Sequence, residues 1–163
     1  MHFLKLATKE NKQIIEMESS SYQTDLLLSF PDELYDLLIR YSIEYENELI
    51  EETKLLYDSW LKGDEKTLSK LLTEEVDKEL ISEFSDYEEI NSLVQEFEDK
   101  LITQRNNEMT EKTEKYLKED KNVFVVVGLA HIIGEDGIAS QLKERGYTVE
   151  KIDIDKTKLR EQE

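Results

Sequence analysis

Apolar and polar residues alternate with a helical period through most of this chain. Between residues 31 and 62, apolar or aromatic side chains recur every three or four positions, and the proline at the start suits the first turn of a helix. The same spacing predicts a second helix over 64–80 and a longer third helix over 87–118. The chain holds only one proline and five glycines, and so few breakers favour long helices.

Three short segments lack this period and are predicted to be strands. Residues 123–127 form an unbroken apolar run, which is typical of a strand buried on both faces of a parallel sheet. Residues 147–153 alternate in polarity, and residues 13–17 are a further short candidate. Together with a helix predicted at 134–146, the strands at 123–127 and 147–153 would form a right-handed crossover unit. We therefore expect an α/β fold, in which a small parallel-type sheet is interrupted by a long, predominantly helical insertion in a mostly helical chain.

The chain is predicted to form a single domain over residues 1–163. In chain order we expect a strand and helix start at 12–30, the helical insertion at 31–85, a long helix with the strand–helix–strand unit at 86–153, and a frayed tail at 154–163.

The charge balance excludes several classes of partner. The formal net charge is −18, which repels the phosphates of nucleic acids and anionic membrane surfaces. Cysteine is absent, which excludes disulfides, thiolate nucleophiles and zinc–thiolate sites. No apolar run approaches the ~20 residues that span a bilayer, and the first residues lack the apolar core of a signal peptide. We expect a soluble chain without nucleic-acid partners or membrane insertion, whose compartment the sequence does not determine.

Chemistry-bearing residues from distant parts of the chain are predicted to meet at one sheet edge. His131 follows the strand predicted at 123–127. Glu18 follows the strand predicted at 13–17, and Glu16 lies two residues before Glu18. Ligands of open parallel sheets gather outside the carboxyl ends of the strands. Gly128 is expected to let the backbone turn tightly at that edge.

Arg105 interrupts the apolar stripe of the third predicted helix. Helical rise and strand rise place this residue level with the end of the strand at 123–127, beside His131. A buried arginine needs a carboxylate or several acceptors. Three simpler interpretations stay open: His131 as an ordinary hydrogen-bonding loop residue, Glu18 as a solvated residue near a helix start, and Arg105 with its head group in solvent.

The C-terminal half resembles a known family signature. The stretch from "RNNEM" through "VFVVVGLAHIIGEDG" to "GYTVEKI" resembles the C-terminal part of the TraB/GumN family, which includes the Tiki proteins. Upstream, "IIEMESSSYQ" and "SWLKGDEKTLSKLL" are similar to two further family segments. The resemblance covers about residues 12–152 and implies a site of two G-x-x-H histidines, a glutamate and an arginine.

In this chain Gly128 and His131 match the second G-x-x-H, Glu18 matches the glutamate, and Arg105 with Asn106 matches an Arg-Asn pair. The first G-x-x-H is missing, so we expect the chain to correspond to the C-terminal portion of a family domain. Some Tiki relatives are metal-dependent proteases. One interpretation of the resemblance is therefore a complete parent that is a metal-dependent hydrolase, in which His131 would be a metal ligand, Glu18 a metal ligand or the base, and Arg105 would stabilise an oxyanion.

By itself the chain is expected to be inactive and to bind no divalent metal. The alternatives are a noncatalytic domain that binds a peptide or regulates a partner, and a structural helical oligomer. Uncovered apolar stripes and unpaired strand edges predict a homodimer, formed by strand exchange or by packing of the helices.

Overall fold

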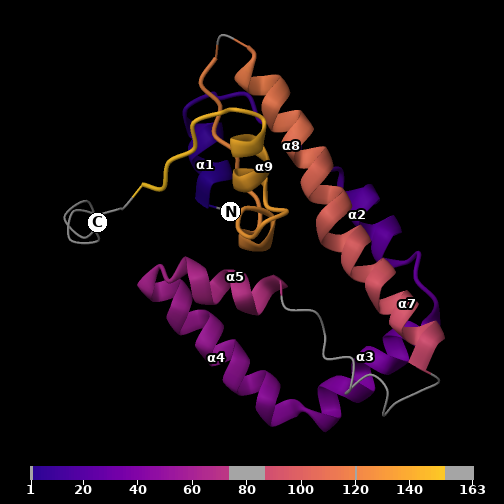
Figure 1. Ribbon diagram of the computed structural model, residues 1–163. Coiled ribbons are helices and arrows are strands. Elements are labelled where there is room, and N and C mark those ends of the chain that lie inside the picture. Colours follow the sequence, from indigo (N-terminus) through magenta and orange to yellow (C-terminus); the bar gives the residue numbers. More distant parts are fainter. Residues whose placement is uncertain (1, 74–86, 120, 153–163) are drawn as a thin grey trace.

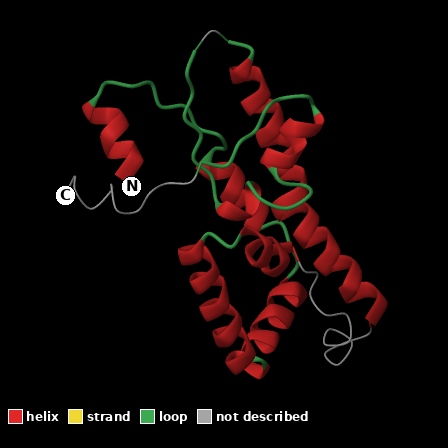
Figure 2. Ribbon diagram, turned by 60° about the vertical axis from the view of Figure 1, so that its left-hand side comes forward, coloured by secondary structure: helices red, strands yellow, loops and turns green. Residues whose placement is uncertain are grey.

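The computed structural model describes residues 2–73, 87–119 and 121–152. Within these residues the chain consists of helices joined by loops, and no strand is present (Figure 2). The elements are, in chain order, α1 (His2–Lys9), α2 (Ser20–Leu27), α3 (Asp32–Glu44), α4 (Glu46–Lys62), α5 (Glu65–Thr73), α7 (Tyr87–Glu98), a π-helical turn η1 (Asp99–Thr103), α8 (Gln104–Leu117), a 3₁₀ turn η2 (Leu129–His131) and α9 (Ile138–Glu144).

A single long rod organises the fold. α7, η1 and α8 follow one another without a break and form this rod (Figure 1). α3 packs against its α7 end and α9 against its α8 part, while α4 and α5 pack on each other as a hairpin whose second helix contacts η2. The rod therefore carries residues from its middle toward both the N-terminal segment and the loop before α9. Among the described helices, none is long and apolar enough to cross a membrane.

Side-chain and glycine caps set the ends of the helices. Ser19 accepts a hydrogen bond from the backbone N–H of Tyr22 at 3.1 Å and caps α2, and Asp64 caps α5 through the backbone N–H of Thr67 at 3.2 Å. Gly63 and Gly146 follow α4 and α9 with φ of 70° and 89°, a left-handed conformation that favours glycine at a helix end. These caps confirm the predicted breaks after residues 62 and 145.

Two apolar clusters lie along the rod. The first joins α2, α3 and α7, and its buried members are Phe30, Leu34, Leu37 and Val94. The second joins α8 and α9, and its buried members are Met109, Ile138 and Leu142. Arg105 and the buried polar residue Asn106 lie on the rod between Val94 of the first cluster and Met109 of the second.

The predicted α/β sheet is wrong for the described residues. Residues 122–127 are extended, with Val127 packed on the second cluster, but Phe124 is 73% exposed and the segment makes no strand ladder. Residues 147–151 likewise direct Tyr147 and Val149 toward that cluster without pairing. A strand needs a neighbour to satisfy its backbone N–H and C=O groups, and among the described residues no ladder of backbone hydrogen bonds pairs another segment with either one. The apolar run correctly predicted an extended backbone. A sheet also requires a second segment that pairs with it.

The helix predictions hold with two changes. The helix predicted over 31–62 is broken at Tyr45, whose φ of −105° and ψ of 30° separate α3 from α4. Helix α1 was not predicted. The part of the second predicted helix beyond residue 73, the end of the helical insertion at 74–85 and the tail at 154–163 lie outside the described residues.

The π-helical turn rotates the buried face of the rod. In η1 the backbone N–H of Gln104 bonds to the carbonyl of Asp99, five residues back instead of four. The extra residue shifts the stripe by one position, so the buried residues of α8 are Asn106, Met109, Thr110 and Thr113. Arg105 consequently lies at the edge of the buried face and Asn106 at its centre.

Candidate functional site

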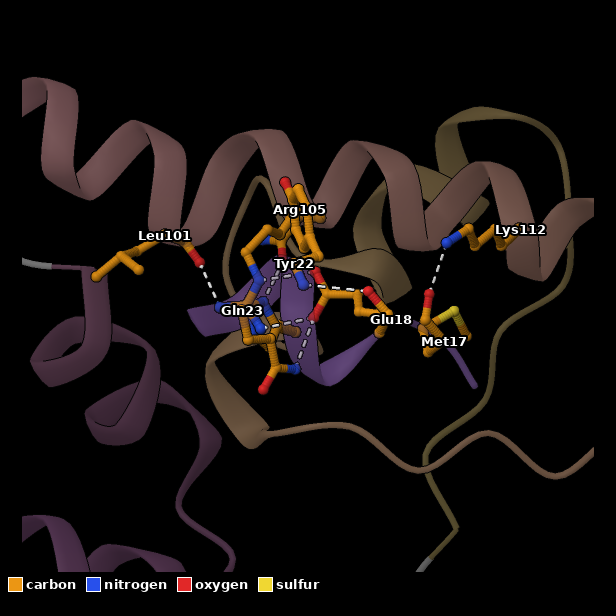
Figure 3. A network of polar contacts seen from close by, with 10 residues as sticks. Met17, Glu18, Tyr22, Gln23, Leu101, Arg105 and Lys112 are labelled. Carbon is orange, nitrogen blue, oxygen red and sulfur yellow. Dashed lines mark hydrogen bonds and ion pairs between the residues drawn. The ribbon is translucent and has the colours of Figure 1, made fainter. Parts of the chain in front are cut away.

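The centre of the candidate site is a two-pronged ion pair between Glu18 and Arg105. Arg105 Nε donates to one carboxylate oxygen of Glu18 at 2.8 Å, and Nη2 donates to the other at 2.8 Å (Figure 3). The third nitrogen, Nη1, donates to the carbonyl of Leu101 at 3.0 Å. The side chain of Glu18 is 4% exposed and that of Arg105 is 15% exposed. The pair is therefore nearly buried and its strongest donors and acceptors are satisfied.

Two further hydrogen bonds, one from α2 and one from α8, hold Met17 and Glu18 in place. Gln23, on the first turns of α2, donates to a carboxylate oxygen of Glu18 at 3.1 Å. Lys112 donates from Nζ to the carbonyl of Met17 at 2.6 Å, two helical turns along α8 from Arg105 (Figure 3). Met17 and Glu18, which precede α2, are therefore both bonded to side chains of α8.

A second network joins α8 to the loop before α9. Asn106, which is 1% exposed, donates from Nδ2 to the carbonyl of Asp136 at 3.0 Å. Its Oδ1 lies 2.7 Å from Nδ1 of His131 and accepts that hydrogen bond. The neutral imidazole therefore carries its proton on Nδ1, which leaves the lone pair on Nε2. Gln141 also donates to the carbonyl of Asp136, at 2.8 Å.

The electrostatics tie the two networks together. Hydrogen bonding by the Arg105 guanidinium holds the pKa of Glu18 below its ordinary value. Burial lowers the pKa of His131, the positive charge of Arg105 lowers it further, and the negative charge of Glu18 acts in the opposite direction. His131 is thus kept neutral beside the ion pair, although Asn106 is the partner it contacts directly.

The structure brings together four of the six residues predicted for the site. Glu18 binds Arg105, His131 binds Asn106, and Arg105 and Asn106 are neighbours on α8. Glu16 is exposed and joins neither network. Gly128 has φ of −62° and ψ of 148°, which any residue adopts, so its backbone does not need the freedom of glycine.

Several contributing residues were missed at the level of sequence. Nothing in the spacing of Gln23 marks it as a partner of Glu18, and Lys112 was not recognised as a partner of Met17. Tyr22 lies beside the ion pair, and burial followed by the charge of Glu108 raises the pKa of its phenol (Figure 3). The one signal that was available for Lys112 is its spacing of seven from Arg105, which places both on one face of a helix.

An open groove lies beside the second network. It has a volume of about 1080 Å³ and runs between α5, the middle of the rod and the loop at 130–137. Asn106, which follows Arg105 in the chain, and Ala130, which precedes His131, belong to its wall. Its charged lining consists of five carboxylates and two amines, from Glu65, Glu98, Asp99, Glu135, Asp136, Lys66 and Lys70.

The described residues do not by themselves fit the divalent metal that the resemblance implies. Both oxygens of Glu18 accept hydrogen bonds from Arg105, and one also accepts from Gln23. Across the ranges that the structure describes, no three His, Cys, Asp or Glu side chains are grouped so as to hold a metal ion.

Comparison with models of protein families gives a match over most of the chain. The model of the TraB/PrgY/gumN family matches residues 1–151. Comparison with curated proteins and with solved structures finds no match. The chain belongs to the TraB/PrgY/gumN family.

Acid is expected to destabilise the fold in two steps. The folded-state pKa of His131 is lowered, so unfolded chains take up a proton first as the pH falls below about 6.5, and the free energy of unfolding decreases. Between pH 7 and 5.5 the loss is expected to reach up to about 1 kcal/mol. The pKa of Glu18 is also lowered, so its contribution is present above about pH 4.3 and is lost on further acidification.

Urea unfolding of the wild type and of His131→Gln at both pH values measures the first step. The decrease between pH 7 and 5.5 should be absent in His131→Gln and retained in His2→Gln, which alters the exposed histidine of α1. An unchanged decrease in His131→Gln would contradict the assignment.

Proposed function

We propose that this chain is a noncatalytic peptide-binding domain of the TraB/PrgY/gumN family, and that the groove beside Asn106 and Asp136 takes the peptide. The observation that carries the proposal is the groove itself, which has about 1080 Å³ of space and polar residues along its walls. Ligand sites are typically concave and contain a few polar groups that orient the ligand.

The polar networks support a scaffolding role for Arg105 and Asn106. The guanidinium of Arg105 is engaged by Glu18 and by the carbonyl of Leu101. Asn106 is engaged on both ends of its amide by His131 and Asp136. Groups that are fully engaged and buried hold neighbouring segments in place, and here they hold the loop that forms one wall of the groove.

Charge indicates the class of peptide. The groove is lined by five carboxylates against two lysines, and complementary charge both steers association and disfavours wrong partners. We expect a segment rich in lysine or arginine to bind, and an acidic segment of equal length to be excluded.

Fluorescence anisotropy with a labelled lysine-rich decapeptide tests this function. The double variant Glu135→Gln/Asp136→Asn removes two charges from the groove and leaves the carbonyl of Asp136 in place. We expect a dissociation constant raised about tenfold, since the loss of two charge contacts is worth on the order of 1 kcal/mol. Glu144→Gln/Glu150→Gln makes the same change outside the groove and should bind like the wild type. Equal binding by all three proteins, or equal binding of a glutamate-rich peptide, would contradict the proposal.

A second candidate function rests on His131. Burial and the charge of Arg105 lower the pKa of its imidazole, and Asn106 orients the ring through Nδ1, which leaves the lone pair on Nε2. In a longer parent with further ligands, this atom would be suited to a metal or to general-base chemistry in a hydrolase. Calorimetry with zinc separates the candidates: stoichiometric binding that His131→Ala abolishes would favour the hydrolase.

A further inference from the structure

The extended segment that follows α9 reaches the turn between α4 and α5. Lys151 donates from Nζ to the carbonyl of Gly63 at 3.1 Å, across 88 positions of the chain, and the same ammonium lies 3.3 Å from a carboxylate oxygen of Glu65. Gly63 caps the end of α4 and Glu65 is the first residue of α5. In Figure 1 the yellow end of this segment lies on the same side of the molecule as the α4–α5 turn. One lysine therefore contacts both ends of that turn.

Packing of the preceding residues places Lys151 at the turn. Tyr147 and Val149 pack on the second apolar cluster, which joins α8 and α9. Side chains two positions apart lie on the same side of an extended backbone, and Lys151 is the next residue in this series. Its position therefore follows from the anchoring of the segment on the core.

Glu65 has two roles in the structure. It is the ion-pair partner of Lys151, and it is also one of the five carboxylates that line the groove. A cationic side chain of a ligand that reached Glu65 would meet the ammonium of Lys151 already beside this carboxylate. Like charges that are brought together oppose binding.

We propose that Lys151 determines the affinity of the groove by competing with the cationic side chains of a bound peptide for the carboxylate of Glu65. This inference rests on the proposed function and adds an internal competitor to it. A lysine-rich peptide that occupies the groove displaces Lys151 from Glu65, and this displacement weakens its binding. Removal of the ammonium of Lys151 should therefore strengthen binding of the peptide.

The packing of α5 argues against a mainly structural role for Lys151. α5 packs on α4 and contacts η2, and Leu68 in the middle of α5 is buried. The side chains of Lys151 and Glu65 are both 57% exposed, and exposed ion pairs contribute little to stability. The wall that α5 forms should therefore stay in place when Lys151 is replaced, while the charge at Glu65 becomes available.

Fluorescence anisotropy with the labelled lysine-rich decapeptide tests the competition. Lys151→Gln should lower the dissociation constant about two- to fivefold, the range that an exposed ion pair supports. Lys151→Arg keeps the positive charge and should bind like the wild type. Lys121→Gln makes the same change of charge at another exposed ion pair, with Glu119, and should also bind like the wild type.

A double-mutant cycle separates competition at Glu65 from a general effect of charge. In a Glu65→Gln background, Lys151→Gln should leave the dissociation constant unchanged, because the carboxylate for which the two cations compete is gone. An effect that persists in this background would overturn the proposal. Equal binding by the wild type and Lys151→Gln, or weaker binding by Lys151→Gln, would overturn it and leave the proposed function intact. A wild type that binds no decapeptide would overturn both.

Backbone NMR gives an independent measurement. The amide of Asp64 belongs to the peptide group whose carbonyl, that of Gly63, accepts the hydrogen bond from Lys151. Adding the decapeptide to the wild type should move the Asp64 amide signal toward its position in Lys151→Gln, because a peptide ammonium at Glu65 repels Lys151. A peptide-bound wild type whose Asp64 signal does not move in that direction would contradict the competition.

Discussion

Replacing Glu18 with alanine is expected to lower the free energy of unfolding by about 3–5 kcal/mol, because Arg105 would be left as an uncompensated charge in a nearly buried position. The Glu18 side chain is 4% exposed and accepts both prongs of the guanidinium at 2.8 Å. Glu18→Ala also removes the fastening between the segment before α2 and the middle of the rod. Chemical denaturation at pH 7 measures the change.

Arg105→Met is expected to cost less than Glu18→Ala. Methionine keeps apolar contact at the edge of the stripe, and Glu18 can then lower its own cost by taking up a proton. The double variant should be less destabilised than the sum of the two single variants, since it leaves no unpaired charge. A loss of below about 1 kcal/mol for Glu18→Ala, the range of a solvent-exposed pair, would contradict the buried geometry.

Gly137→Ala is expected to destabilise the chain by roughly 1–3 kcal/mol or more, as overpacking does in a well-packed site. A Cβ atom on Gly137 would lie 2.4 Å from the carbonyl oxygen of Ile133 and 2.5 Å from that of Ile132. Both are backbone atoms, so relief requires movement of the loop that Asn106 holds through Asp136. Thermal unfolding followed by circular dichroism gives the size of the effect.

Gly128→Ala is the matched control for this substitution. The added Cβ would lie 3.7 Å from Cδ2 of the His131 ring, an ordinary contact, and the backbone φ is −62°. Its melting temperature should stay close to that of the wild type. Similar losses in both variants would show that the loop tolerates no side chain at either glycine, contrary to the geometry at Gly128.

Much of the candidate site could be predicted from the sequence because its residues break local patterns. Arg105 stands where an apolar residue is expected, and His131 follows an apolar run that ends in a glycine. The structure pairs Arg105 with Glu18, at a sequence separation of 87. The deeper role of Asn106 could not be predicted in this way, because the π-helical turn that centres it on the buried face has no signature in the apolar spacing.

By itself the sequence indicated the family of this protein and determined most of its helices and several of their ends. The helix periods and the caps at Ser19, Asp64 and Gly146 act through bonds to near neighbours in the chain. The tertiary structure alone decided whether residues 122–127 and 147–151 form a sheet and what surrounds His131. Extended residues become a strand only when another segment satisfies their backbone groups. The histidine environment likewise depends on Asn106, 25 residues away, and on the charges of Arg105 and Glu18.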